Sequence, residues 1–179
     1  GIAYVMVRSA SGGQELWKSN GMTEGTVKVK TIRSREGLST SHHTTATTLG
    51  NIFYFVGDDG EHGREVWRTD GTDAGTYMVK DIRTDDKNES IPDIRRMTAF
   101  NNALYINASD AGGEMSLFRS DGTSAGTNEI HDSDQILEFM PNDDKLLFIS
   151  QGANGQKLFA TDGTMAGTAL LQDLPPNVG

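Results

Sequence analysis

Residues 65–76 read EVWRTDGTDAGT, and closely related stretches occur at three other places in the chain. They read ELWKSNGMTEGT (15–26), SLFRSDGTSAGT (116–127) and KLFATDGTMAGT (157–168). Their closing threonines are 50, 51 and 41 residues apart. A catalytic loop is rarely needed four times at near-even spacing, whereas repeats with a period of roughly 20–50 residues are typical of solenoids, propellers and arrays. The stretch therefore predicts a repeated supersecondary unit.

The composition agrees with a turn-rich, all-β globular domain. The chain has 179 residues, 35% of them hydrophobic, and 21 glycines, which is enough for one domain with a core. Its net charge of −9 argues against nucleic acid and anionic membrane surfaces as partners. The absence of cysteine excludes disulfides and thiolate metal sites. No apolar run approaches the roughly 20 residues of a membrane span, so we expect no membrane insertion.

Each unit has the strand content of a propeller blade. The second copy shows three runs of aromatic, branched and alternating residues that predict strands: NIFYFVG (51–57), REVWRT (64–69) and TYMVKDI (76–82). The segments between them, DDGEHG (58–63) and DGTDAG (70–75), have the residues of tight turns. With a further strand ahead of these three, each unit holds about four short strands, as in the blades of known propellers.

We therefore predict an all-β fold, a β-propeller built of four blade-like repeats of three to four antiparallel strands, which can form part of a larger ring. One repeat domain spans residues 1–179, with copies at about 1–38, 39–90, 91–133 and 134–179. A first strand precedes the later copies as TTATTL (44–49), RRMTAF (95–100) and QILEFM (135–140), but the first copy has no counterpart. We expect that the chain does not close a ring alone, and that a neighbouring subunit or a larger propeller supplies the missing strand.

The repeats share a consensus, ELWxxDGTxxGTxxVKDI, which resembles the ELWxxDGT repeat family of large secreted and surface proteins of bacteria. The match is almost intact at Glu65–Trp67, Asp70–Thr72 and Val79–Ile82, and it extends to MTAFNNALYINASD (97–110). The resemblance implies a β-propeller-like fold and a secreted or cell-surface location, but no defined activity. Departures at Asn20–Met22, and Phe for Trp in the last two copies, indicate a structural constraint and not a preserved reaction centre.

The recurring Asx-Gly pair predicts a tight turn between two strands. Glycine takes positive φ without steric cost, and an Asx side chain accepts hydrogen bonds from nearby backbone N–H groups. The expected structural turn residues are Asn20, Asp70, Asp121, Asp162, Gly71, Gly122 and Gly163. The aromatic residue three positions before each Asx is expected to pack between neighbouring blades, and these residues are Trp17, Trp67, Phe118 and Phe159.

No metal or cofactor is predicted, and calcium is the alternative. Asp58, Asp59 and Glu61 offer the hard oxygen ligands that Ca²⁺ prefers. The equivalent turns hold a carboxylate only in the second and third copies, and a D-x-D-x-D-G loop is absent. The histidines (His42, His43, His62 and His131) lack the spacing of a zinc site, so they are predicted to face solvent on strands or turns.

Three functions compete. The first is a non-enzymatic, extracellular binding or adhesion module of a secreted bacterial protein, which recognises a protein or a glycan through propeller loops. The second is a purely architectural repeat in a surface assembly, with neighbouring subunits as its partners. The third is a hydrolase or lyase with a site in the central channel. The repeated residues are explained by turns and packing, and no G-x-S-x-G elbow is present, so the first two are favoured.

Overall fold

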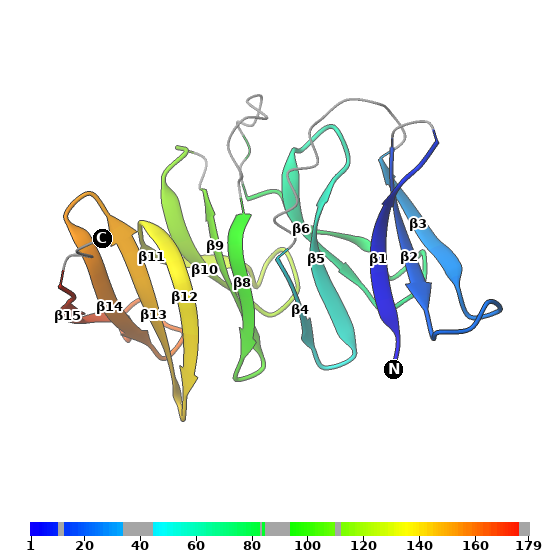
Figure 1. Cartoon of the computed structure of the whole chain (residues 1–179). Helices are drawn as coiled ribbons and strands as arrows, with labels where there is room; N and C mark the ends of the chain where they lie inside the picture. Colours follow the sequence, from blue (N-terminus) through cyan, green and yellow to red (C-terminus); the bar gives the residue numbers. More distant parts are fainter. Residues whose placement is uncertain (11–12, 34–44, 83, 85–93, 110–111, 176–179) are drawn as a thin grey trace.

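The computed structural model describes residues 1–10, 13–33, 45–82, 84, 94–109 and 112–175, and it places these residues in four antiparallel β-sheets (Figure 1). The first sheet contains β1 (Ala3–Arg8), β2 (Gln14–Ser19) and β3 (Val27–Arg33). The second contains β4 (Ala46–Leu49), β5 (Ile52–Asp58), β6 (Arg64–Thr69) and β7 (Tyr77–Lys80). The third contains β8 (Ile94–Phe100), β9 (Ala103–Ser109), β10 (Met115–Ser120) and β11 (Asn128–Asp132). The fourth contains β12 (Gln135–Asn142), β13 (Lys145–Gly152), β14 (Gly155–Thr161) and β15 (Ala169–Asp173).

Each sheet is an up-and-down meander in which consecutive strands pair. The aromatic residue of the repeat lies opposite the same position of the preceding strand in every sheet: Trp17 opposite Val5, Trp67 opposite Phe55, Phe118 opposite Ile106 and Phe159 opposite Phe148. The register with the last strand shifts immediately before the aromatic residue in all four sheets. A bulge at one fixed place increases the local twist, so the four copies share one curved shape.

The first sheet has three strands, and in the described part of the chain β1 is paired only with β2. The other three sheets each begin with the additional strand that the sequence predicts, as β4, β8 and β12. These first strands pack side by side, β4 against β8 and β8 against β12. The all-β, four-sheet architecture predicted from the sequence is confirmed. In the described residues β1, the equivalent of β5, β9 and β13, therefore lies at an open edge of its sheet.

The core lies between the sheets. We call the side of a sheet that looks toward the next sheet along the chain its forward face, and the opposite side its backward face. Leu16, Val29 and Ile32 on the forward face of the first sheet meet Phe55 and Trp67 on the backward face of the second. Equivalent clusters join the second sheet to the third and the third to the fourth. The first and fourth sheets lie at opposite ends of the resulting arc (Figure 1).

Candidate functional site

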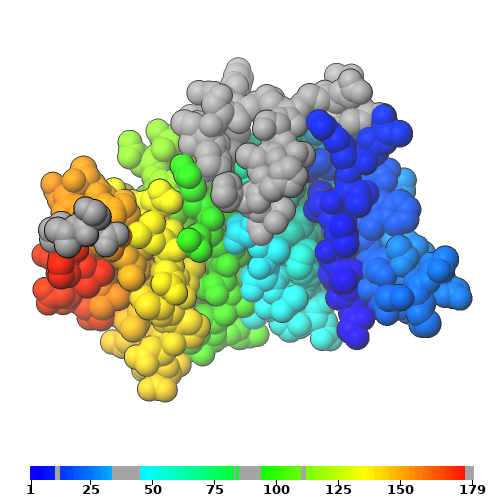
Figure 2. Space-filling model, in the orientation of Figure 1, coloured from blue at the N-terminus to red at the C-terminus, as the bar shows by residue number. Residues whose placement is uncertain are grey.

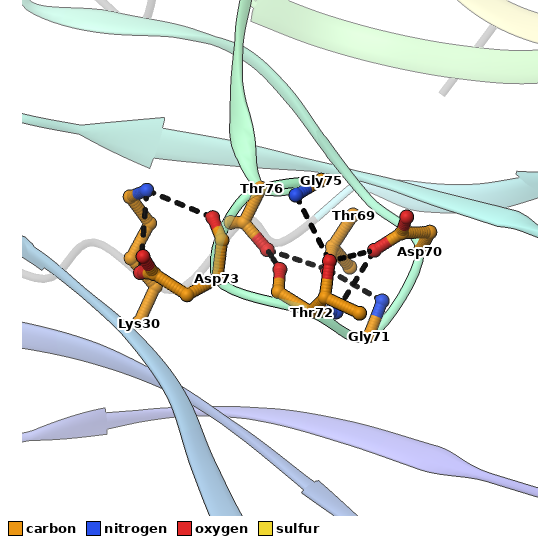
Figure 3. A network of polar contacts seen from close by, with 8 residues as sticks. All are labelled: Lys30, Thr69, Asp70, Gly71, Thr72, Asp73, Gly75 and Thr76. Carbon is orange, nitrogen blue, oxygen red and sulfur yellow. Dashed lines mark hydrogen bonds and ion pairs between the residues drawn. The ribbon is translucent and has the colours of Figure 1, made fainter.

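The repeated DGT segment forms a hydrogen-bonded turn between the last two strands of its sheet, and Figure 3 shows this turn in the second sheet. In the second sheet, Asp70 Oδ1 accepts hydrogen bonds from the backbone N–H and the hydroxyl of Thr72 at 2.8 and 2.7 Å. Thr72 Oγ1 in turn accepts from the Gly75 N–H at 3.0 Å. The Thr76 hydroxyl donates to the Thr72 carbonyl at 2.6 Å and lies 2.6 Å from Thr69 Oγ1. The turn thus satisfies its own polar groups.

Two glycines in the turn are required for different reasons. Gly71 has φ +91°, a left-handed conformation that side chains other than glycine adopt only at a cost. Gly75 faces the Asp70 carboxylate so closely that a Cβ atom at Gly75 would overlap it. The same crowding occurs at the equivalent glycine of the other three copies. Both Gly-Thr pairs of the motif are therefore explained by local geometry.

The turn carboxylates are held in their ionised form. The Thr72 hydroxyl bond, assisted by the Thr72 backbone N–H, lowers the pKa of Asp70. Thr123 and Thr164 lower the pKa of Asp121 and Asp162 in the same way. A lowered folded-state pKa contributes stability above the ordinary aspartate pKa, and this contribution is lost as the pH falls through the lowered value. In the first sheet Asn20 accepts the corresponding bond from the Met22 N–H at 3.0 Å.

The Thr76 hydroxyl gives a direct test of the turn. Thr76→Val should lower the free energy of unfolding by about 1–3 kcal/mol, because the buried Thr69 hydroxyl then loses its acceptor. The matched control is Thr26→Val, which removes the same bond from the exposed turn of the first sheet and should cost under about 0.5 kcal/mol. Denaturant unfolding measures both. Equal losses of stability in the two variants would show that burial of the hydroxyl pair does not determine the cost of removing it.

A tyrosine from each of the first three sheets reaches the turn of the next sheet. The hydroxyls of Tyr4, Tyr54 and Tyr105 lie against the positive-φ glycines Gly71, Gly122 and Gly163 respectively. Cations accompany them: Lys18 Nζ donates to the Gly71 carbonyl at 2.7 Å, and Lys30 lies 3.0 Å from the Asp73 carbonyl (Figure 3). Sequence reasoning missed these tyrosines, although their spacings of 50 and 51 residues equal those of the turns.

Three of the four repeat aromatics lie between sheets. Trp67 packs in the cluster that joins the first and second sheets, and its ring covers Gly57, where a Cβ atom would be 2.8 Å from Trp67 Cδ1. Phe118 and Phe159 occupy the corresponding places at the next two interfaces. Trp17 differs from the prediction, because it is on the backward face of the first sheet, where the described chain has no preceding sheet. It is half-buried, and its Nε1 donates to Glu15.

The calcium candidates are engaged with other groups. Asp58 Oδ2 lies 2.8 Å from Arg33 Nη1, and Asp58 Oδ1 accepts from the Gly60 N–H. Asp59 accepts from the backbone N–H groups of Glu61 and His62 and lies 2.8 Å from His62 Nδ1. Within the described ranges no group of three or more His, Cys, Asp or Glu side chains is arranged to hold a metal ion. The geometry gives calcium no support at this turn.

The β5–β6 turn (Asp58–Gly63) is nevertheless chemically distinct from its counterparts. It carries three carboxylates and a histidine, whereas the equivalent segments read SASGG (9–13), SDAGG (109–113) and QGANG (151–155). Glu61 is exposed, and Asp59 and His62 are partly exposed. The turn lies at the end of the second sheet opposite its DGT turn, because β6 runs from one to the other. It is the candidate recognition site.

The two histidines in the described part of the chain lie in different environments. His62 forms an ion pair with Asp59, and this hydrogen bond raises the pKa of His62. His131 was predicted to face solvent, and this is wrong: its ring packs on Phe159 and Phe148 between the third and fourth sheets. Burial lowers the pKa of His131. His42 and His43 lie outside the described residues.

These opposite shifts predict opposite effects of pH. Below the ordinary histidine pKa of about 6.5, the His62–Asp59 pair contributes its full stabilisation, which is lost as the pH rises through the raised pKa. Burial favours the neutral imidazole of His131 in the folded chain. The fold therefore loses stability as the pH falls through about 6.5, because His131 of the unfolded chain takes up a proton there. NMR titration of the imidazoles, assigned with His62→Asn and His131→Asn variants, measures both values. A pKa of His131 at or above that of His62 would contradict this assignment.

Comparison with solved structures identifies the architecture. Pyrococcus horikoshii acylaminoacyl peptidase is similar with a TM-score of 0.58 and 15% identity, over 97% of this chain and 26% of the peptidase chain. TolB from Acinetobacter baumannii is similar with a TM-score of 0.54 and 14% identity, over 96% of this chain and 41% of TolB. The chain thus spans less than half the length of either protein. The likeness and the four consecutive antiparallel sheets show a β-propeller-type fold, as the sequence predicts.

Other comparisons add little. A chain of a nidogen/laminin complex aligns with a TM-score of 0.47 and 9% identity, over 97% of this chain and 62% of that one. No protein-family model and no curated protein sequence matches this chain. No helix in the described part of the chain has the length and apolarity needed to cross a membrane.

Proposed function

We propose that this chain is a non-enzymatic binding module of a secreted or cell-surface bacterial protein, and that it recognises a protein or a glycan through the turns at one end of its sheets. The residues shared by the copies support this proposal, because their side chains are used within the DGT turns and between the sheets. They therefore supply rigidity. The extracellular, bacterial part of the proposal rests on the resemblance to the ELWxxDGT repeat family.

The observation that carries the proposal is the β5–β6 turn, where side chains not needed by the repeat gather. Asp58 is buried in a salt bridge with Arg33 of the first sheet, which fixes the turn against β3. Asp59 holds the backbone of the next residues through two N–H bonds of 2.9 Å. Glu61 and the outer face of His62 are left toward solvent on this rigid base. Binding residues are commonly carried on loops that a rigid scaffold positions.

The electrostatics of this turn favour a ligand with a cationic or hydrogen-bond-donating surface. Glu61 and Asp59 are carboxylates in a chain of net charge −9. Complementary charges on two partners raise their association rate, and salt weakens this effect. We therefore expect protein ligands to present basic residues and glycan ligands to present hydroxyl donors.

The experiment compares two charge reversals on glycan and peptide arrays. Glu61→Lys alters the exposed turn at the proposed binding end, and Glu24→Lys makes the same change in the exposed DGT-type turn of the first sheet. The wild-type chain should give specific signals that Glu61→Lys removes and Glu24→Lys retains. Absence of any specific signal, or equal loss in the two variants, would contradict recognition through the β5–β6 turn.

A further inference from the structure

The exposed large apolar side chains are concentrated at the two ends of the arc. Among the described residues there are eight, of which seven belong to the first and last copies and the remaining one is Tyr77 of the second. Those of the first copy are Ile2, Val5, Met22 and Val27, and those of the last are Met165, Leu170 and Leu171. Figure 2 shows these two copies at opposite sides of the molecule. A globular chain buries such residues where it can. The first and last sheets therefore differ from the two inner sheets in the apolar surface that they leave exposed.

The first end exposes one half of an inter-sheet interface. Val5 lies opposite Trp17 on the backward face of the first sheet. The equivalent pair in the second sheet, Phe55 and Trp67, is 3% and 7% exposed because the first sheet covers it. Val5 is 49% exposed. Among the described residues, no heavy atom beyond the chain neighbours lies within 4 Å of a Cβ atom placed on Gly21, whereas a tyrosine hydroxyl lies at the equivalent glycine of the next three copies.

The other end exposes the complementary half. Leu171 occupies the position of Val29, Val79 and Ile130, which are buried on the forward faces of the first three sheets. Leu171 is 53% exposed. Leu158, at the position of the fully buried Leu16 and Leu117, is only partly buried. The forward face of the fourth sheet thus has the apolar residues of an interface, and no other sheet of the described residues covers them.

The two exposed halves also depart from the inner interfaces in matching ways. On the forward face of the fourth sheet, Leu147, Ala160 and Gln172 occupy the positions of Tyr4, Lys18 and Lys30, which reach the next turn from the first sheet. On the first sheet, Asn20, Met22 and Thr23 replace the Asp, Thr and Asp of the second turn. The forward face of the fourth sheet thus lacks these cations, and the turn of the first sheet lacks a carboxylate at positions 20 and 23 but keeps Glu24. At the position where inner sheets place a tyrosine against the next turn, these two ends have the apolar residues Leu147 and Met22.

We propose that the forward face of the fourth sheet binds the backward face of the first sheet in a second copy of this chain. A chain that carries both halves of one interface associates head to tail, and such contacts form rings when the rotation closes. Two copies joined twice in this way place eight sheets around one axis, which is within the roughly 4–8 blades of known propellers. Leu147 of one copy then meets Gly21 and Met22 of the other, an apolar contact in place of the inner tyrosine–turn contact.

The first test measures mass in solution by light scattering and sedimentation, from about 1 µM to about 1 mM, the range of weak protein pairs. The wild-type chain should form a two-chain species. Val5→Asp and Leu171→Asp should each raise the dissociation constant at least about tenfold, because each places a carboxylate in an apolar interface. Tyr77→Asp is the control, since it adds the same charge at an exposed apolar residue of an inner sheet, and it should leave the two-chain species intact.

Mixing the two end variants tests the head-to-tail arrangement. A Val5→Asp chain keeps its Leu171 face, and a Leu171→Asp chain keeps its Val5 face, so together they form one unaltered interface and should restore a one-to-one pair. Restoration also proves that both variants are folded. A single-chain mass for the wild type at every concentration would overturn the proposal, as would a pair insensitive to both end substitutions or a mixture that stays single-chain.

Discussion

Replacing Trp67 with alanine should lower the free energy of unfolding by about 3–5 kcal/mol, one of the largest effects expected of any single substitution in this chain. Trp67 is 7% exposed and lies between its own sheet and the forward face of the first. Its ring fills the space above Gly57, so alanine leaves a cavity at an interface that two sheets share. Denaturant unfolding followed by circular dichroism measures the loss.

Trp17 is the matched control, because it occupies the same position of the repeat. Trp17 is half-buried on the backward face of the first sheet, so Trp17→Ala in dilute protein should cost about 1 kcal/mol or less. A loss below about 1 kcal/mol for Trp67→Ala would mean that the repeat aromatic does not hold the sheets together. Equal losses for the two tryptophans would contradict the assignment of Trp17 to an uncovered face.

Gly122→Ala should destabilise the fold by about 2–4 kcal/mol, the combined cost of backbone strain and overpacking. Gly122 has φ +89°, and a Cβ atom at this position would overlap the Tyr54 hydroxyl. Tyr54 is 2% exposed and packed in the cluster between the second and third sheets, so it has little room to move away. Thermal and denaturant unfolding both report the loss.

Gly21→Ala separates the two costs. Gly21 has nearly the same backbone, with φ +90°, but nothing lies within 4 Å of a Cβ atom placed there. The substitution should therefore cost only the conformational part, about 1 kcal/mol. If Gly21→Ala and Gly122→Ala destabilised the chain equally, the tyrosine–turn contact would have no part in joining the sheets.

The sequence was sufficient to predict the strands, because its signals are local. Alternation in REVWRT places Val66 and Trp67 on opposite faces, and the structure has them in different clusters. The hydrogen bonds of an Asx-Gly turn are formed by its own residues, so the DGT turn could be predicted without knowing which sheet lies beside it. The sequence also shows no counterpart of TTATTL (44–49) ahead of the first copy, and in the described residues the first sheet has three strands.

Contacts between sheets could not be predicted in the same way. The tyrosines recur with the repeat, but their partners are glycines about 67 residues later in the first pair, 68 in the second and 58 in the third, and only the curvature of the stack brings them together. His131 was assigned to solvent because the histidines lack the spacing of a zinc site, whereas its ring packs on Phe148 and Phe159 of the next sheet. Trp17 shares its motif with Trp67, and only its place at the end of the arc distinguishes it.

The repeated motif joins each sheet to the preceding one, and we propose that recognition is carried by other residues. The most direct measurement is a double-mutant cycle of Tyr54→Phe and Gly122→Ala across the interface of the second and third sheets. Removing the tyrosine hydroxyl removes the nearest atom to the new Cβ, so the double variant should be at least about 1 kcal/mol more stable than the sum of the single losses predicts. Additivity within about 0.5 kcal/mol would contradict the claim.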